Sequence, residues 1–293
     1  MEQIGALAAL GAALMWTLNS AVIEKKGHGL DGGSLNFGRM MLGLLLISVV
    51  SAISSGHLLP LEASVTSWLS LLLSGFLGFS LGDTFLMKSF QALGARLTLL
   101  IFSFAPVLTA ILSYFLFHEK LSAINISGMV LVIAGIVLVI SGKQVNRGAK
   151  LSLQGLMFAL AASLGQALGT IFSKFGLEDI SPLPATQIRL LGGLAGMAFM
   201  MTVSRRRVAL KQAFQSANGR VVMLSGAVLG TLIGVSLSMA ALQLTKGAIA
   251  STLMSTMPIL ILPISVLFLK EKLSARDIAG AVLSVSGMAV LFI

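Results

Sequence analysis

The chain has 293 residues, of which 56% are hydrophobic and 10% are charged, and its formal net charge is +10 at pH 7. A water-soluble domain of this size could not cover so much apolar surface, so the composition indicates a membrane protein. The absence of cysteine excludes disulfides and thiolate sites for metals or catalysis. The positive residues are spread over short loops and aromatic residues make up only 6%, so the charge does not indicate nucleic-acid binding.

Apolar segments of about 20 residues can cross a bilayer as helices, because a helix satisfies its own backbone hydrogen bonds. The sequence predicts ten such helices, in chain order 4–23, 35–54, 67–87, 98–117, 124–140, 153–173, 184–203, 221–242, 248–269 and 276–293. The predicted fold class is therefore an all-α membrane protein with ten transmembrane helices.

The two halves of the sequence are related by an internal repeat. The pentapeptide Glu119–Ala123 recurs letter for letter at Glu271–Ala275, 152 residues later. The same offset relates further pairs, which are Gln91 and Gln243, Ser103 and Ser255, and Pro106 and Pro258. Five helices per half is an odd number, so the second half must run through the membrane in the opposite direction. We therefore expect two inverted five-helix repeats, residues 1–142 and 151–293, an arrangement typical of transporters.

The distribution of Lys and Arg predicts the orientation. Odd-numbered loops between the predicted helices hold 15 of these residues, and even-numbered loops hold only three. Loop 57–66 contains none, whereas its repeat counterpart 204–220 contains five. Because positive loops stay in the cytoplasm, we expect the odd loops inside and both termini outside the cytoplasm.

Several polar or aromatic side chains lie within the predicted helices. A lipid-exposed amide or hydroxyl is unfavourable, so these side chains should point inward, either into a substrate cavity or into helix contacts. The candidates for a neutral, hydrogen-bonding cavity are Trp16, Asn19, Gln91, Phe102, Ser103, Gln166, Gln243 and Ser255.

Four charged residues within or at the edges of helices are functional candidates by the same reasoning. Asp83 and Arg96 have the uncharged repeat counterparts Val235 and Ala248. We expect Asp83 and Arg96 to pair at one end of a helical hairpin, either as a structural clamp or as a gate or proton-coupling site. Two further arginines, Arg39 and Arg189, are repeat counterparts at an offset of 150 and would either extend to the lipid headgroups or face the pore.

Prolines and serines in the repeated segments predict local helix geometry. Pro106 and Pro258 should bend their helices, and such bends either border transport sites or only improve packing. Ser122 and Ser274 precede helices and are followed three residues later by Asn125 and Asp277. This spacing is close to a capping box, which favours a structural role for the repeated pentapeptide over a gating role.

Three stretches resemble the ten-helix drug/metabolite transporter (DMT) superfamily, specifically its EamA-type members. They are Leu14-Met15-Trp16 with Asn19 and Lys25; Ser103-Phe104-Ala105-Pro106 with Glu119-Lys120-Leu121-Ser122 and Gly128; and Ser255-Thr256-Met257-Pro258 with Glu271-Lys272-Leu273-Ser274 and Gly280. The resemblance implies two five-helix bundles, one per half, around a central cavity that moves small metabolites by alternating access.

We therefore predict a multi-pass secondary transporter of the cytoplasmic membrane, a monomer or homodimer, carrying an amino acid or related compound. Its energy would come from the substrate gradient or from protons. The chain lacks a nucleotide-binding glycine loop, and its three histidines are scattered in loops, so neither an enzyme nor a metal or cofactor site is expected. The alternatives are a lipid-carrier flippase and a non-transporting membrane scaffold or enzyme subunit.

Overall fold

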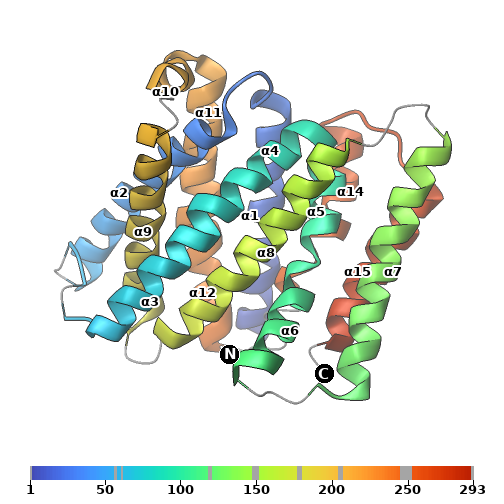
Figure 1. Ribbon diagram of the computed structural model, residues 1–293, viewed down its shortest axis with the longest axis horizontal. Coiled ribbons are helices and arrows are strands. Elements are labelled where there is room, and N and C mark those ends of the chain that lie inside the picture. Colours follow the sequence, from blue (N-terminus) through green and yellow to red (C-terminus); the bar gives the residue numbers. More distant parts are fainter. Residues whose placement is uncertain are drawn as a thin grey trace.

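The protein is a bundle of long helices (Figure 1). The computed structural model describes residues 2–55, 58–60, 62–117, 121–146, 152–176, 180–203, 207–244 and 253–291. The regular structure of these residues is entirely helical, and eight of the helical segments are long and apolar enough to cross a membrane. A shorter apolar helix, Met257–Leu267, and the helix Ala275–Leu291 complete the described bundle. The predicted all-α membrane fold is confirmed.

The first repeat contains five helical spans, two of which are built from several segments. They are α1 (Glu2–Lys26); α2 (Gly32–Ser55); α3 (Val65–Gly75) continuing through the π-helix η1 (Phe76–Gly82) into α4 (Asp83–Leu93); α5 (Ala95–Phe102) followed by α6 (Ala105–Phe117); and α7 (Ala123–Asn146).

The second repeat has the same order of elements. It contains α8 (Leu153–Gly176); α9 (Pro182–Val203); α11 (Ala217–Ser225) continuing through the π-helix η2 (Gly226–Val235) into α12 (Ser236–Leu244); α14 (Met257–Leu267); and α15 (Ala275–Leu291). The π-helices occupy equivalent places in the two repeats. A π-helical turn leaves backbone carbonyls without their usual α-helical partners, and such turns are frequent at functional sites.

Two features of the described residues differ clearly from the sequence prediction. The third span continues to Leu93 and ends at Gly94, which has a φ of 82°; Lys88 lies within it, with its ammonium 5.6 and 5.3 Å from the ring centres of Phe85 and Phe158. The predicted loop 204–220 contains an additional helix, α10 (Arg207–Gln215), which packs against α2 and α11.

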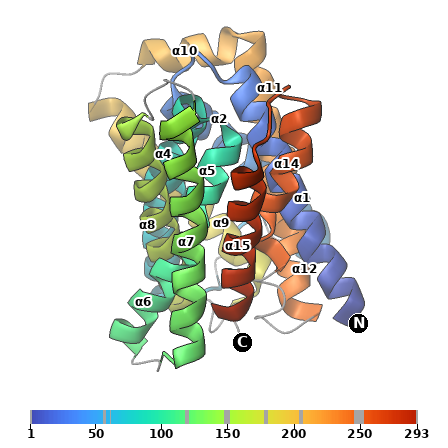
Figure 2. The same cartoon turned by 90° about the vertical axis from the view of Figure 1, so that its right-hand side faces the viewer.

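Reciprocal glycine contacts between α7 and α15 demonstrate the inverted relation of the repeats. These two helices run antiparallel, side by side, at one edge of the bundle (Figures 1 and 2). A Cβ atom on Gly128 would lie 2.7 Å from the carbonyl oxygen of Gly287, and one on Gly287 would lie 2.7 Å from that of Gly128. Gly135 and Gly280, their repeat counterparts, approach each other in the same way, at 2.6 and 2.7 Å. Each contact has its symmetry mate, as a twofold relation requires.

The repeats interleave and do not form the two separate bundles expected from the resemblance. The third span of each repeat packs against the first two helices of the other: α3 and η1 against α8 and α9, and η2 against α1 and α2. Glycines allow this approach, since a Cβ on Gly165 or Gly169 of α8 would lie 2.7 or 3.0 Å from the Cα of Gly82 or Gly78. A mutual shift of the repeats must therefore involve contacts throughout the core.

The two ends of the bundle differ in charge. The beginning of α1 and the end of α15 lie together at one end, which we call the terminal end (Figures 1 and 2). The opposite end carries α10 and the turn between α14 and α15, and we call it the basic end (Figure 2). In the described part of the chain, Lys211 of α10, Arg220 of α11 and Arg276 of α15 belong to the basic end, which agrees with the prediction that this end faces the cytoplasm.

A central cavity as the candidate functional site

A cavity with two adjoining chambers lies between the repeats. The outer chamber has a volume of about 490 Å³ and reaches Asn125 and Leu291 at the terminal end. The inner chamber, of about 200 Å³, lies deeper in the bundle. The chambers adjoin, and the residues that line both are Trp16, Leu99, Phe102, Gln166 and Met257.

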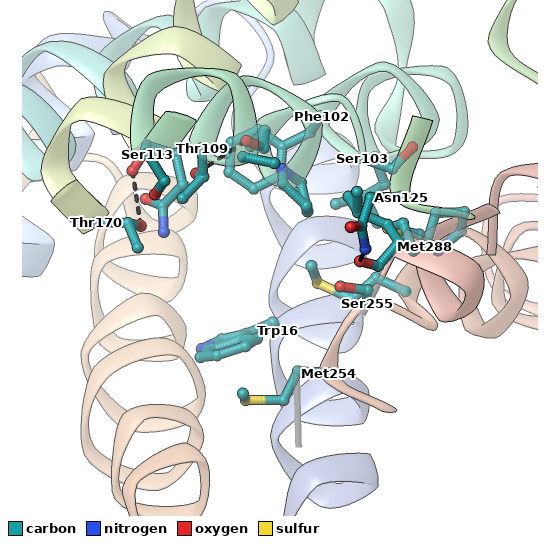
Figure 3. Close-up of a pocket in the computed structure, with 18 of the residues that line it drawn as sticks. Trp16, Phe102, Ser103, Thr109, Ser113, Asn125, Thr170, Met254, Ser255 and Met288 are labelled. Carbon is teal, nitrogen blue, oxygen red and sulfur yellow. Dashed lines mark hydrogen bonds between the residues drawn. The ribbon is translucent and has the colours of Figure 1, made fainter. Parts of the chain in front are cut away.

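The lining of the outer chamber consists largely of repeat-related pairs. At the offset of 152 these are Phe102 and Met254, Ser103 and Ser255, Ala105 and Met257, and Pro106 and Pro258. At the offset of 150, Trp16 of α1 corresponds to Gln166 of α8. Figure 3 shows Trp16 and Met254 facing Phe102 and Thr109 across open space. The cavity therefore lies at the interface between the two repeats, and equivalent positions of both repeats line it.

Two helix interruptions shape the wall of the outer chamber. The turn at 103–104 separates α5 from α6, and the equivalent turn at 255–256 precedes α14. Each turn lies just before a proline. Within a continuous helix, the proline ring would clash with the carbonyl four residues earlier, and proline has no backbone N–H to donate. A hydroxyl group in each turn donates to a nearby carbonyl: Ser103 to that of Leu100, and Thr256 to that of Leu253 at 2.7 Å.

The structure brings together six of the eight cavity candidates. Those that line the outer chamber, the inner chamber or both are Trp16, Asn19, Phe102, Ser103, Gln166 and Ser255. Gln91 lies elsewhere: its amide donates to the carbonyls of Gly27 at 2.7 Å and Leu30 at 3.0 Å, in the turn after α1. Gln243 belongs to α12, but its side chain lies outside the described part of the structure.

Other polar lining residues were missed by the sequence reasoning. They are Thr109, Ser113, Asn125 and Thr170. The spacing of Phe102, Pro106, Thr109 and Ser113 was the available signal, since residues three or four apart share one helix face. The sequence predicts only a capping role for Asn125, which also donates from Nδ2 to the carbonyl of Leu291 at 2.9 Å.

An ion pair lies in the inner chamber, between Arg39 of α2 and Asp83 at the start of α4. Arg39 Nη2 donates to the Asp83 carboxylate and to Asn36 Oδ1, the latter at 2.9 Å. Asn36 in turn donates to the carbonyl of Phe79 in η1 at 2.7 Å. On the other side, Trp16 Nε1 donates to the carbonyl of Gly230 in η2 at 3.0 Å. Each π-helix therefore supplies a carbonyl acceptor to a side chain beside the cavity.

The expected pairing of Asp83 with Arg96 is wrong. Asp83 lies ten residues before the end of the extended third span and pairs with Arg39, whereas Arg96 lies at the basic end. Within the described residues, Arg96 pairs with Asp277 at 3.0 Å and with Glu271 at 3.2 Å. The spacing along the sequence suggests a local hairpin contact, but the interleaved repeats bring Glu271 and Asp277 of the other half to Arg96, and Asp83 finds its partner on α2 of its own half.

This Arg96 cluster connects the two repeats between the cavity and the basic end. Arg96 lies one helical turn from Leu99, which lines both chambers, and its partners belong to the segment that leads into α15. Asp277 also accepts from the backbone N–H of Ser274 at 2.9 Å, as the capping-box spacing predicted. At the terminal end the repeat counterpart of Asp277 is the neutral Asn125. Charged inter-repeat contacts thus lie beyond the cavity at the basic end.

The described residues contain no group of three or more His, Asp or Glu side chains that could hold a metal ion. The polar groups of the cavity are a single ion pair, amides, hydroxyls and an indole N–H. Such a lining can bind and release a small molecule by hydrogen bonds and charge.

Comparison with known proteins relates both halves to one family. The EamA-like transporter family matches the chain twice, over residues 3–141 and over residues 153–293. A chloroplastic WAT1-related protein of Arabidopsis thaliana is 26% identical over 246 residues, which are 82% of this chain and 57% of that protein. This chain therefore spans little more than half the length of the plant relative.

Two further matches extend over almost the whole chain. An uncharacterized transporter of Archaeoglobus fulgidus is 24% identical over 277 residues, which are 94% of this chain and 92% of that protein. A crystal structure with 16% sequence identity superposes with a TM-score of 0.65 and covers 98% of this chain and 95% of that one. At this identity, the structural likeness supports the fold alone.

Proposed function

Because the chain belongs to the EamA-like transporter family, we propose that it is a secondary transporter that moves a small metabolite, an amino acid or related compound, across the cytoplasmic membrane. The observation that carries the proposal is the cavity lined by repeat-related pairs. A site at the interface of inverted repeats can be exposed to either side by nearly equivalent arrangements of the same helices.

We further propose that the protein works by alternating access and that the structure corresponds to the state open at the terminal end. The outer chamber reaches that end, whereas the Arg96 cluster connects the repeats beyond the cavity at the basic end. Opening the basic end requires Arg96 to leave Asp277 and Glu271. The structural clamp and the gate proposed from the sequence are then one set of contacts, with Arg96 in the gate and Asp83 in the substrate chamber.

The charge distribution supports an orientation with the basic end in the cytoplasm and both termini outside it. In this orientation the described state faces away from the cytoplasm. Energy would come from the substrate gradient or from protons. Coupling through Asp83 would require its carboxylate to exchange Arg39 for a proton, so a coupled mechanism must open the Arg39–Asp83 pair during each cycle.

A flux experiment on purified protein in liposomes tests this function. Uptake of labelled amino acids and related small metabolites is compared for wild type and for Ser255→Trp, which fills the outer chamber. Ser127→Trp is the matched control, because Ser127 is exposed on the outer surface of α7. The proposal expects saturable flux in wild type and control and its loss in Ser255→Trp. Absence of flux for all metabolites, together with movement of fluorescent lipid headgroups, would support the flippase alternative.

A further inference from the structure

Two repeat-related arginines lie against the π-helices near the inner chamber. Arg39 of α2 lies along η2, where a Cβ on Gly226 would collide with its side chain and one on Gly230 would lie 3.8 Å from its Nη1. Arg189 of α9 lies along η1, where a Cβ on Gly78 would lie 3.6 Å from its Nη2. Each repeat therefore places one guanidinium against the π-helix of the other repeat.

The chamber wall connects the two arginines. Arg39 lines the inner chamber directly. Arg189 lies behind Phe79, with its guanidinium carbon 4.5 Å from the centre of that ring, and Phe79 itself lines the chamber. Leu190, the neighbour of Arg189 on α9, lines it too. Both positive charges are consequently close to the same small volume.

The negative charge near this volume is insufficient for two cations. Asp83 forms its ion pair with Arg39, and its repeat counterpart, Val235, is uncharged. Asp83 is also the carboxylate that acts electrostatically on Arg189. Among the described residues, no ion pair to Arg189 occurs, and its Nε is buried without a hydrogen-bond partner. Two guanidinium groups and one carboxylate leave one positive charge uncompensated within the membrane, which is unfavourable.

We propose that the transported substrate is a small carboxylate anion with an apolar body, which binds in the inner chamber and supplies the missing negative charge. Arg39, which lines the chamber, offers a planar guanidinium whose N–H groups can bind carboxylate oxygens, while Arg189 acts through its charge from behind Phe79. The remaining lining suits an apolar body, since Phe90, Leu99 and Met257 surround the chamber. This inference rests on the proposed transport function and narrows its substrate class from amino acids and related compounds to organic acids of about amino-acid size.

Four compounds with one carbon skeleton and different charges test the inference. They are 3-phenylpropanoate (anion), phenylalanine (zwitterion), 3-phenylpropanamide (neutral) and phenylalanine amide (cation). Binding to the purified protein is measured by thermal shift over a concentration series. We expect 3-phenylpropanoate to bind at least about tenfold more tightly than 3-phenylpropanamide, with phenylalanine between them and the cation weakest. Equal stabilisation by acid and amide, or none by the acid, would overturn the inference.

Substitutions of Arg189 test whether its positive charge causes the preference for the acid over the amide. Arg189→Gln should reduce the acid-over-amide preference to about one, whereas Arg189→Lys should retain most of it because the positive charge remains. Arg276→Gln is the matched control, because Arg276 is exposed at the start of α15. Should Arg189→Gln fail to fold, the wild-type comparison and Arg189→Lys still decide the question. An unchanged preference in a folded Arg189→Gln protein contradicts the assignment.

Flux of the same compounds separates this inference from the transport function. Preferential binding of 3-phenylpropanoate without flux in liposomes would support the anion site and contradict transport. Flux of the neutral amide at the rate of the acid would support transport and contradict the anion site.

Discussion

Replacing Arg96 should destabilise the protein more than replacing either of its carboxylate partners, and a second substitution should partly restore the loss. The side chain of Arg96 is 6% exposed and that of Asp277 is 9% exposed, so removing the guanidinium leaves a buried carboxylate unpaired. Breaking a buried pair in this way costs about 3–5 kcal/mol. In Arg96→Gln the carboxylate of Asp277 keeps only its capping contacts with Ser274.

The partner substitutions should be milder. In Asp277→Asn, Arg96 keeps Glu271 at 3.2 Å, and the asparagine oxygen can still accept from Ser274, so we expect a loss of about 1–2 kcal/mol. Glu271 is 27% exposed, which screens its charge, and Glu271→Gln should cost about 1 kcal/mol or less.

The stability of the double variant, compared with that of Arg96→Gln, decides whether the pair exists. Arg96→Gln combined with Asp277→Asn removes both buried charges, so it should be more stable than Arg96→Gln alone. Thermal unfolding of the four proteins in one detergent gives the double-mutant cycle. Arg276→Gln serves as the control for loss of a positive charge at the same end of the molecule. Losses that simply add, with the double variant least stable, would refute the proposed inter-repeat pair.

Three further substitutions test the packing around the cavity. Gly226→Ala should displace Arg39 and weaken binding of 3-phenylpropanoate at least tenfold, and unchanged binding would contradict the placement of this side chain against η2. Gly287→Ala should lower the free energy of unfolding by about 1–3 kcal/mol, because its Cβ would meet the α7 backbone at 2.6 Å. Ser286→Ala is the control, since Ser286 is exposed on the same helix and its substitution should leave the unfolding temperature unchanged. Trp16→Phe removes the hydrogen bond to η2 and should cost about 1 kcal/mol in thermal unfolding, so full retention of stability would show that this bond is not important.

The repeat made much of the fold predictable. Exact recurrence of Glu119–Ala123 at Glu271–Ala275, together with ten apolar segments, predicted the helical class and the inverted relation. Pairs at the same offset, such as Ser103 and Ser255, also line the cavity together. A residue that recurs in both inverted repeats lies either at the interface between the repeats or at equivalent positions on opposite faces of the membrane. A polar side chain within an apolar helix favours the interface.

Charge partners could not be predicted in this way. Arg96 and Asp83 are near each other in sequence, yet Arg96 pairs with Asp277 of the other repeat, which the interleaved packing brings to it, and Asp83 pairs with Arg39 of its own repeat. Polarity alone also misplaced Gln91, because an amide that satisfies the carbonyls of a turn has the same sequence signature as one in a cavity. The π-helices had no recognisable signal, since their glycines are equally typical of close α-helix packing.

Alternating access of the central cavity is tested most directly by labelling one cavity position from each face of the membrane. The chain has no cysteine, so Ser103→Cys introduces one reactive group in the outer chamber, and Glu62→Cys and Gln212→Cys mark the terminal and basic ends. A membrane-impermeant maleimide is applied to vesicles of each orientation. We expect Ser103→Cys to react from the terminal face, and to react from the basic face only when Arg96→Gln is added. Equal reaction of Ser103→Cys from both faces in the otherwise unchanged protein, or from neither, would contradict alternating access.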